Sequence, residues 1–305
     1  MFVLLFVLGI LPRATVTAQA SPTPDTITVG AVVREYFVYR TPAVDTSRPS
    51  PLLLVFHGGG GSAQGAMARY GFSGAAGASG AYVVYPQGLN GHWSDGRGIF
   101  TAGDDVAFTT ALVARLRTRL RIDPRRIYAV GHSNGAIFVN SLACRVPGVF
   151  AAIGAMAGTI PLNDVALCRS AAPISVIEIH GTADPLTLYA GGTIGLARGA
   201  ISGAEASIAE WAAVDGCKSP PTRTPLPPII ATDSTRVVQL AFSGCRDARG
   251  VVLYAIQGAG HNWPGGALPM PESAVGPSTQ QLDATRVIWD FFMVHPAPKD
   301  AVAVP

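Results

Sequence analysis

The stretch AVGHSNGAIF, residues 129–138, decides how this 305-residue chain is interpreted, because it contains the pattern Gly-x-Ser-x-Gly with Ser133 at its centre. Such a pattern marks a nucleophilic serine where a strand runs into a tight turn and a helix leaves it at once. Residues 127–130 read as a strand, and residues 136–144 form a helical pattern that ends before a proline. A glycine-rich chain also produces the pattern by chance, so the interpretation depends on partner residues.

Two later strands supply candidate partners for this serine. In such sites the serine is followed along the chain by an acid and then by a histidine, each placed after a strand. Asp184 follows the apolar run ISVIEI, and His261 follows VVLYAIQ, both in glycine-containing loops. We expect His261 to take the proton of Ser133 and return it to the leaving group. Asp184 is expected to hold the imidazole in the required tautomer.

A glycine-rich loop supplies a candidate for stabilising negative charge. The run HGGGG, residues 57–61, follows the apolar strand pattern LLLVF and matches the loop that lends a backbone N–H to an oxyanion hole. We expect one N–H from this loop and a second from Asn134, the residue after the serine. The alternative, a phosphate cradle, is disfavoured because no Lys-Ser/Thr pair follows the glycines.

The other acidic residues and histidines fit structural positions better than catalytic ones. A metal site is not expected, because no pair of the six histidines has ligand spacing on one helix and no Cys-x-x-Cys occurs. The residues set aside are Asp104 and Asp105 (a helix start), Asp164 and Asp215 (a loop and a helix end), His180 (a packed, hydrogen-bonded histidine), and His57, His92, His132 and His295, which precede the serine or lie in the tail.

Short apolar runs alternate with helical patterns from residue 27 to residue 294, which predicts the α/β class and a mostly parallel, doubly wound sheet. One helix is predicted from an N-cap at Asp104 to a stop at Asp123-Pro124, and the last helix from Ser278, which has capping-box spacing to Gln281. The proline-rich residues 218–234 predict a surface excursion, with a domain linker as the alternative. The predicted strands are YFVYR, LLLVFH, AYVVYP, RIYAVGH, ISVIEIHG, VVQLAF and VVLYAIQG.

Composition and the N-terminus indicate an exported globular protein. The chain is 49% hydrophobic and 13% charged with a net charge of +3, which allows a large core and shows no signature of nucleic-acid or membrane-surface binding. Residues 1–20 read as a signal peptide, because a short apolar run ends near Ala18-Gln19-Ala20; a buried N-terminal strand is the alternative. Residues 21–305 are then one domain, secreted or periplasmic.

Four cysteines agree with export, since an even number in an exported chain indicates disulfides. Four cysteines permit three connectivities, and we expect nearest-neighbour pairing. The expected pairs are Cys144 with Cys168 and Cys217 with Cys245.

Eight ordered blocks resemble the exported esterases grouped as the polyhydroxybutyrate depolymerase and feruloyl esterase family, across residues 28–294. They are HGGGGSAQG, VVYPQGLNGHWSDGRG, DDVAF, GHSNGA, IHGTADP, DGC, YAIQGAGHNWPGG and DATRVIWDFF. The resemblance implies an α/β-hydrolase fold, the same three catalytic residues and the same oxyanion loop, with Gly59 at the position of the donor. It also implies that Trp93 and Trp263 lie beside the cleft, with simple packing as the alternative for each.

The expected function is a serine esterase that needs no cofactor and acts as a monomer. The substrates to weigh are feruloyl or acetyl esters of polysaccharides and hydroxyalkanoate polyesters or oligomers. A serine peptidase and a non-catalytic binding protein on the same scaffold are the alternatives. Asn262, where the family commonly has threonine, and the longer link around Tyr189 put the choice of substrate in question.

Overall fold

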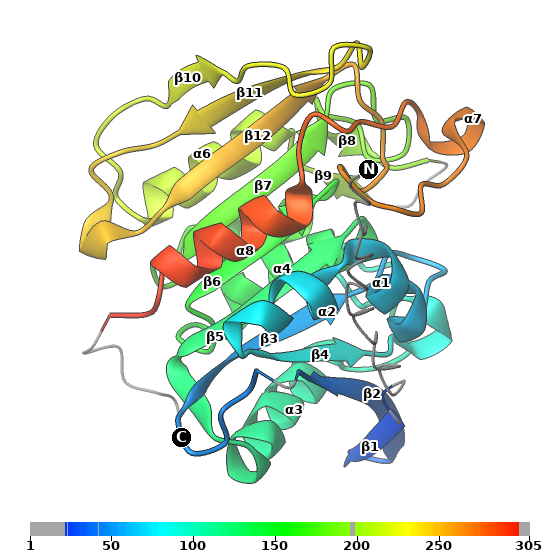
Figure 1. Cartoon of the computed structure of the whole chain (residues 1–305), viewed down its shortest axis with the longest axis vertical. Coiled ribbons are helices and arrows are strands. Elements are labelled where there is room, and N and C mark those ends of the chain that lie inside the picture. Colours follow the sequence, from blue (N-terminus) through cyan, green and yellow to red (C-terminus); the bar gives the residue numbers. More distant parts are fainter. Residues whose placement is uncertain (1–21, 23, 42, 196–198, 299–305) are drawn as a thin grey trace, which may run out of the picture.

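The computed structural model describes residues 22, 24–41, 43–195 and 199–298, which are built around one large mixed sheet (Figure 1). The expected signal peptide, residues 1–20, lies outside the described residues. A small two-stranded sheet, β8–β9, accompanies the large one. The strands are β1 (Pro24–Val29), β2 (Val32–Arg40), β3 (Ser50–Phe56), β4 (Tyr82–Pro86), β5 (Ile122–His132), β6 (Ala152–Met156), β7 (Ser175–Gly181), β8 (Gly192–Thr193), β9 (Ala200–Ile201), β10 (Thr222–Pro225), β11 (Arg236–Ala241) and β12 (Val251–Gln257).

The large sheet has ten strands in the order β1-β2-β4-β3-β5-β6-β7-β12-β11-β10. The central strands from β4 to β12 run parallel, while β1, β2, β11 and β10 pair antiparallel at the two ends. Strand β3 is buried along its whole length, because alternate side chains enter the cores on opposite faces of the sheet. The predicted mostly parallel, doubly wound sheet is confirmed.

Helices cover both faces of this sheet. Side chains of α3, α4 and α6 belong to the core on one face, and those of α1, α2 and α8 to the core on the other. Figure 1 shows the second group in front of the strands. The helices are α1 (Ala63–Tyr70), α2 (Phe72–Ala75), α3 (Asp105–Arg119), α4 (Asn134–Arg145), α5 (Val165–Cys168), α6 (Ala204–Val214), α7 (Glu272–Val275) and α8 (Ala284–Val294), with short 3₁₀ turns at Gly77–Ser79, Leu89–Gly91, Leu162–Asp164 and Arg246–Ala248.

Two predicted helix boundaries are wrong. The N-cap of α3 is Asp104 as predicted, accepting from Ala107 N–H at 2.8 Å, but α3 ends at Arg119 and Asp123-Pro124 belong to β5. The last helix starts at Ala284 rather than near Ser278, because Asp283 caps it by accepting from the N–H of Arg286. The Gln281 side chain is not in a capping box; it accepts from and donates to the backbone of residues 229, 230 and 233.

Strands β1, β6 and β10 were not predicted. Strand β6, sequence AIGAM, consists mainly of small residues with low intrinsic strand preference, and its place at the centre of the sheet determines its conformation. Strand β10 lies within the proline-rich excursion, at the edge of the sheet where a missing N–H donor is tolerated. The excursion therefore stays on the surface, as expected, and extends the sheet by one strand.

Both disulfides have the expected nearest-neighbour pairing, Cys144–Cys168 and Cys217–Cys245. Their sequence separations are 24 and 28 residues, so in the chain-entropy model each stabilises the fold by about 3–4 kcal/mol. No helix in the described part of the chain has both the length and the apolar character needed to cross a lipid bilayer.

Strand β7 carries a buried carboxyl group whose titration should make stability depend on pH. Glu178 is 1% exposed, and its Oε1 accepts from the hydroxyl of Ser207 at 2.7 Å. Burial raises the pKa of Glu178 from 4.5 to about 8. Between these values the unfolded chain releases a proton that the folded chain keeps, so the free energy of unfolding falls as pH rises.

We expect Glu178→Gln to remove this pH dependence, because the amide does not ionise. Between pH 5 and pH 8, the free energy of unfolding of the unchanged protein should fall by about 2–4 kcal/mol more than that of the variant. Urea unfolding at both pH values measures the difference. Glu210→Gln is the control, since Glu210 is a surface carboxylate paired with Arg169. An equal effect of Glu178→Gln at both pH values would contradict the assignment.

Candidate active site

Ser133 occupies a strained turn between β5 and α4. Its backbone has φ 55° and ψ −122°, a conformation that costs a non-glycine residue about 1–3 kcal/mol. The geometry requires glycine on both sides of the turn. A Cβ on Gly131 would lie 2.1 Å from the Gly135 carbonyl oxygen, and one on Gly135 would lie 2.5 Å from the Phe56 carbonyl oxygen. The turn lifts the serine out at the carboxyl edge of the sheet, where function is commonly placed.

Asp184 and His261, from the loops after β7 and β12, are joined by a short hydrogen bond. Nδ1 of His261 lies 2.6 Å from Oδ2 of Asp184. Oδ1 of Asp184 accepts from the backbone N–H groups of Leu186 and Thr187 at 2.8 and 2.9 Å. Burial alone would raise the pKa of Asp184, but the hydrogen bond and charge of His261 hold the pKa below its usual value. The carboxylate is therefore kept ionised and aimed at the imidazole.

Ser133 and His261 line the same cavity, of about 290 Å³, together with Gly59, Trp263 and Met270. We call it the histidine-side cavity. Among the residues that the structure describes, no hydrogen bond joins Ser133 to His261; in unliganded enzymes this contact often tightens only when substrate binds. The three residues predicted from three separate stretches of sequence thus meet at one site.

Thr187 is a site residue that sequence reasoning missed. Its hydroxyl lies 2.9 Å from Oδ2 of Asp184, 3.1 Å from Nδ1 of His261 and 2.9 Å from the Ala157 carbonyl oxygen. Thr187 is 3% exposed. In the sequence, the only indication of this role was the position of Thr187 three residues after Asp184. A turn at this spacing can bring the hydroxyl back to the carboxylate.

We expect Thr187→Val to lower kcat about ten- to hundredfold, the equivalent of one hydrogen bond to a charged group, with little change in KM. The valine has the shape of threonine but cannot donate to Asp184. Steady-state kinetics over a range of pH, with the melting temperature alongside, separates this effect from a loss of folding. Thr187→Ser should restore most of the activity. A serine variant as slow as the valine variant would exclude the hydroxyl as the cause.

The predicted oxyanion donors lie on either side of Ser133. Two backbone hydrogen bonds hold the loop. The N–H of Gly60 donates to the Gly91 carbonyl at 2.8 Å, and the N–H of Gly61 donates to the Gly58 carbonyl at 3.0 Å. Gly59 lines the cavity beside Ser133, and the N–H of Asn134 is the first of helix α4, a position without a partner inside the helix. A Cβ on Gly59 would lie 3.4 Å from the Asn134 Cβ, which places the two donors next to each other.

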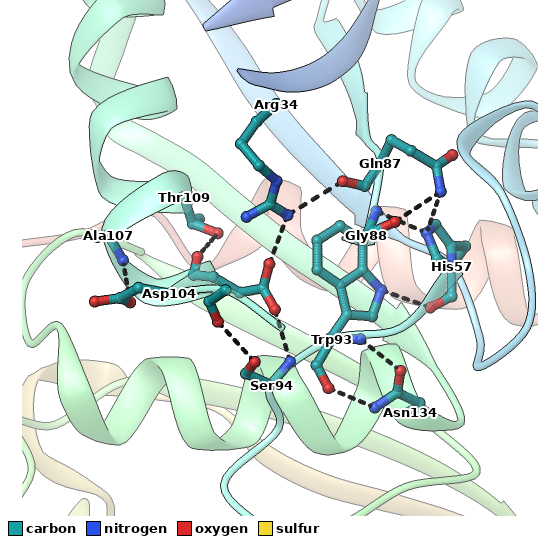
Figure 2. A network of polar contacts seen from close by, with 12 residues as sticks. Arg34, His57, Gln87, Gly88, Trp93, Ser94, Asp104, Ala107, Thr109 and Asn134 are labelled. Atoms are coloured by element: carbon teal, nitrogen blue, oxygen red, sulfur yellow. Dashed lines mark hydrogen bonds and ion pairs between the residues drawn. The ribbon is translucent and has the colours of Figure 1, made fainter. Parts of the chain in front are cut away.

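A network of buried hydrogen bonds holds the loop of residues 57–61 in place (Figure 2). The ring of His57 accepts the N–H of Gly88 at 3.0 Å, and the carbonyl of His57 accepts the indole N–H of Trp93 at 2.9 Å. The Asn134 side chain exchanges hydrogen bonds with the backbone of Trp93 at 2.9 and 3.1 Å, and donates to Asp95 at 2.6 Å. The loop and the start of α4 are therefore fixed to one common framework.

The expectation that Trp93 lies beside the cleft is wrong. Trp93 is fully buried and packs on Phe56 and Phe138, with ring centroids 5.0 and 5.5 Å away. Its indole N–H is used by the oxyanion loop, so the ring is turned into the core (Figure 2). The packing alternative holds for Trp93, which positions the loop and does not form a cleft wall.

Trp263 does line the histidine-side cavity. It stacks on Tyr70 with ring centroids 4.4 Å apart, and its indole N–H donates to Thr285 at 3.0 Å. Asn262 beside it donates to the Met270 carbonyl and the Ser278 hydroxyl and accepts from the Met270 N–H. Asn262 therefore fastens the loop that forms the cavity rim.

His132 is a second residue whose role was missed. Its Nε2 lies 2.9 Å from the His261 carbonyl oxygen, and its Nδ1 lies 3.1 Å from the Tyr70 hydroxyl. Burial, with a lesser contribution from His261, lowers the pKa of His132 to about 3, so the ring is neutral at any working pH. A neutral ring with an Nε2–H ties the loop of His261 to the serine turn.

A second cavity, of about 590 Å³, opens on the other side of Ser133. We call it the helix-side cavity, because Asn134 and Ile137 of helix α4 line it together with His92, Arg97 and Phe100. The rings of His92 and Phe100 stack with centroids 4.2 Å apart. Ser133 therefore lies between two cavities, each of which has room for one part of a substrate.

Several of the residues that were set aside have structural roles. Nε2 of His180 donates to the Thr187 carbonyl oxygen, 2.7 Å away, as expected for a packed histidine. Asp105 pairs with Arg34 at 2.5 Å and accepts the N–H of Ser94, and Asp164 pairs with Arg145. Within the described ranges, no group of three His, Cys, Asp or Glu side chains is placed to hold a metal ion.

Comparisons with known proteins agree with this geometry. Residues 35–202 match the family model described as esterase PHB depolymerase. A protein named esterase NocK, from Nocardia uniformis subsp. tsuyamanensis, is 30% identical over 289 residues, 90% of this chain and 84% of that protein. Feruloyl esterase C of Emericella nidulans is 29% identical over 267 residues, 85% of this chain and 84% of that protein.

Solved structures share the fold at lower identity. Acetyl xylan esterase from Aspergillus awamori has a TM-score of 0.58 at 14% identity and covers 89% of this chain and 99% of its own. A complex of pOPH_S172C with DMSO has a TM-score of 0.55 at 16% identity, covering 96% and 92%. These likenesses show the fold alone, which is that of the α/β-hydrolases.

Proposed function

This chain belongs to the esterase PHB depolymerase family and is a carboxylic ester hydrolase, and from this premise we propose that it acts through an acyl-enzyme formed on Ser133. The observation that carries the proposal is the convergence of Ser133, His261 and Asp184. The first two line one cavity, and the third holds the second through a 2.6 Å hydrogen bond.

The proposed reaction has two halves. Oγ of Ser133 attacks the ester carbonyl carbon while its proton passes to Nε2 of His261, and the oxyanion so formed accepts from the N–H groups of Gly59 and Asn134. The bond from carbon to the alcohol oxygen then breaks, and His261 returns the proton to that oxygen. Water repeats the same steps on the acyl-enzyme, which releases the acid and frees Ser133.

The proposed substrates are esters met outside the cytoplasm. Relatives named feruloyl esterase support aromatic acyl esters of polysaccharides, and the family description supports hydroxyalkanoate polyesters and their oligomers. The two disulfides support export, since such bonds persist in oxidising compartments. We propose a secreted or periplasmic enzyme.

The test is one panel of initial rates on purified residues 21–305. It compares methyl ferulate, acetylated xylan, a hydroxybutyrate oligomer, 4-nitrophenyl acetate and a peptide amide. We expect hydrolysis of several esters and at most slow cleavage of the amide. A rate on the peptide that equals the ester rates would favour a peptidase, and no hydrolysis of any substrate would favour a non-catalytic scaffold.

A further inference from the structure

The two cavities beside Ser133 can be assigned to the two halves of an ester. The leaving oxygen must reach His261, which protonates it, whereas the acyl carbonyl must reach the N–H groups of Gly59 and Asn134. Gly59 and Ser133 line both cavities, whereas His261 lines only the histidine-side cavity and Asn134 only the helix-side cavity. On the proposed mechanism, the alcohol half therefore occupies the histidine-side cavity and the acyl half the helix-side cavity.

The polar side chains around the histidine-side cavity are already committed to protein partners. The Tyr70 hydroxyl is bonded to His132, and the other nitrogen of His132 to the His261 carbonyl. Both ends of the Asn262 amide are used by Met270 and Ser278. These groups fix the shape of the wall. They leave few free side-chain donors and acceptors to bind several hydroxyl groups of a ligand.

Apart from Arg69 and the backbone of the glycine-rich loop, the rest of the wall is mainly apolar. Trp263, Met270, Leu268 and Leu186 line the cavity, and Leu268 and Leu186 are 54% and 43% exposed at its mouth. Arg69 also reaches the mouth, where its guanidinium donates to the Leu268 carbonyl at 2.7 Å. A sugar placed here would lose hydrogen bonds to water without regaining them, whereas an apolar group would bury its surface.

We infer that the leaving alcohol of the natural substrate is apolar and is not a sugar. This inference rests on the proposed function and narrows it. Of the substrates proposed above, hydroxyalkanoate esters fit the histidine-side cavity, because their alcohol half is a carbon chain with one ester or carboxyl group in place of several hydroxyl groups. Esters carried on a polysaccharide hydroxyl do not fit it.

The experiment varies only the alcohol. Cyclohexylmethyl acetate and methyl 5-O-acetyl-arabinofuranoside share the acetyl group and a primary leaving oxygen on a ring of similar bulk. We expect kcat/KM, normalised by the rate of hydroxide hydrolysis, to favour the cyclohexylmethyl ester about a hundredfold. Equal values, or a preference for the sugar ester, would overturn the inference.

Two variants test which cavity holds the alcohol. Met270→Ala removes an apolar side chain from the histidine-side cavity and keeps the backbone bonds to Asn262. It should lower the ratio of kcat/KM for cyclohexylmethyl acetate to kcat/KM for methyl acetate about tenfold. Phe100→Ala, the matched change in the helix-side cavity, should leave that alcohol preference unchanged and alter the ratio between methyl acetate and methyl ferulate. The opposite pattern would overturn the assignment.

Hydrolysis of 4-nitrophenyl acetate distinguishes a failure of this inference from a failure of the proposed function. An enzyme that hydrolyses this ester but prefers the sugar alcohol overturns the inference and leaves the proposed function standing. A protein that hydrolyses none of the esters overturns the proposed function, and the inference falls with it.

Discussion

Ser133→Ala should lower kcat by about 10⁴-fold or more, because no other group at the site replaces the attacking oxygen. Alanine has the same backbone restrictions as serine, so the strained φ of 55° remains. The free energy of unfolding should therefore change by less than about 1 kcal/mol. Initial rates on 4-nitrophenyl acetate and urea unfolding of the same preparation measure both quantities.

The matched control is Ser73→Ala. Ser73 is half-buried like Ser133, and its hydroxyl is bonded to Tyr85 away from the site. The control should keep nearly full activity. Activity that survived in Ser133→Ala would end the assignment of this serine as nucleophile. Contaminating enzyme is recognised by a specific activity that differs between independent preparations of the variant.

Asp184→Asn should lower kcat about 10⁴-fold while the protein stays folded. Oδ1 of Asp184 accepts from two backbone N–H groups, so the amide of asparagine must keep its oxygen there. The NH₂ group then faces Nδ1 of His261, which must accept and so carries its proton on Nε2. A protonated Nε2 cannot take the proton of Ser133.

The same argument predicts the pH dependence of the residual activity. In Asp184→Asn the serine proton has no neutral acceptor in the right tautomer, so the remaining rate should rise with hydroxide concentration. Glu205→Gln is the control, because Glu205 is an exposed carboxylate bonded to Tyr189 and Arg223. A loss of less than about tenfold in Asp184→Asn would assign the orienting role elsewhere, with Thr187 as the first alternative.

The parts of the site that sequence predicted are those set by local chemistry. The turn around Ser133 needs glycine on both sides, and Asp184 and His261 each follow an apolar run, so their order and places could be read. Thr187 and His132 could not be assigned, because their roles depend on distances between loops from different strands. Trp93 was assigned to the cleft through resemblance, whereas its indole orientation depends on the carbonyl of His57.

In the fold, too, the elements set by local sequence were predicted and those set by distant contacts were not. The buried central strands have continuous apolar runs and were predicted, but β6 is made of small residues that become a strand only between β5 and β7. The start of α8 was placed too early because Ser278 and Gln281 have capping spacing. In the folded chain Gln281 instead binds the loop before β11, a partner about 50 residues away in sequence.

The Cys144–Cys168 disulfide has a consequence for how the protein can be made. Helix α4 begins beside the nucleophile and carries Cys144 in its last turn, so this bond fastens the far end of the helix to α5. A bacterial cytosol keeps thiols reduced, and there the end of α4 would be held by packing alone. Protein recovered from that compartment should be trimmed more readily by proteases near residues 145–170. An oxidising compartment is therefore the better source of homogeneous material.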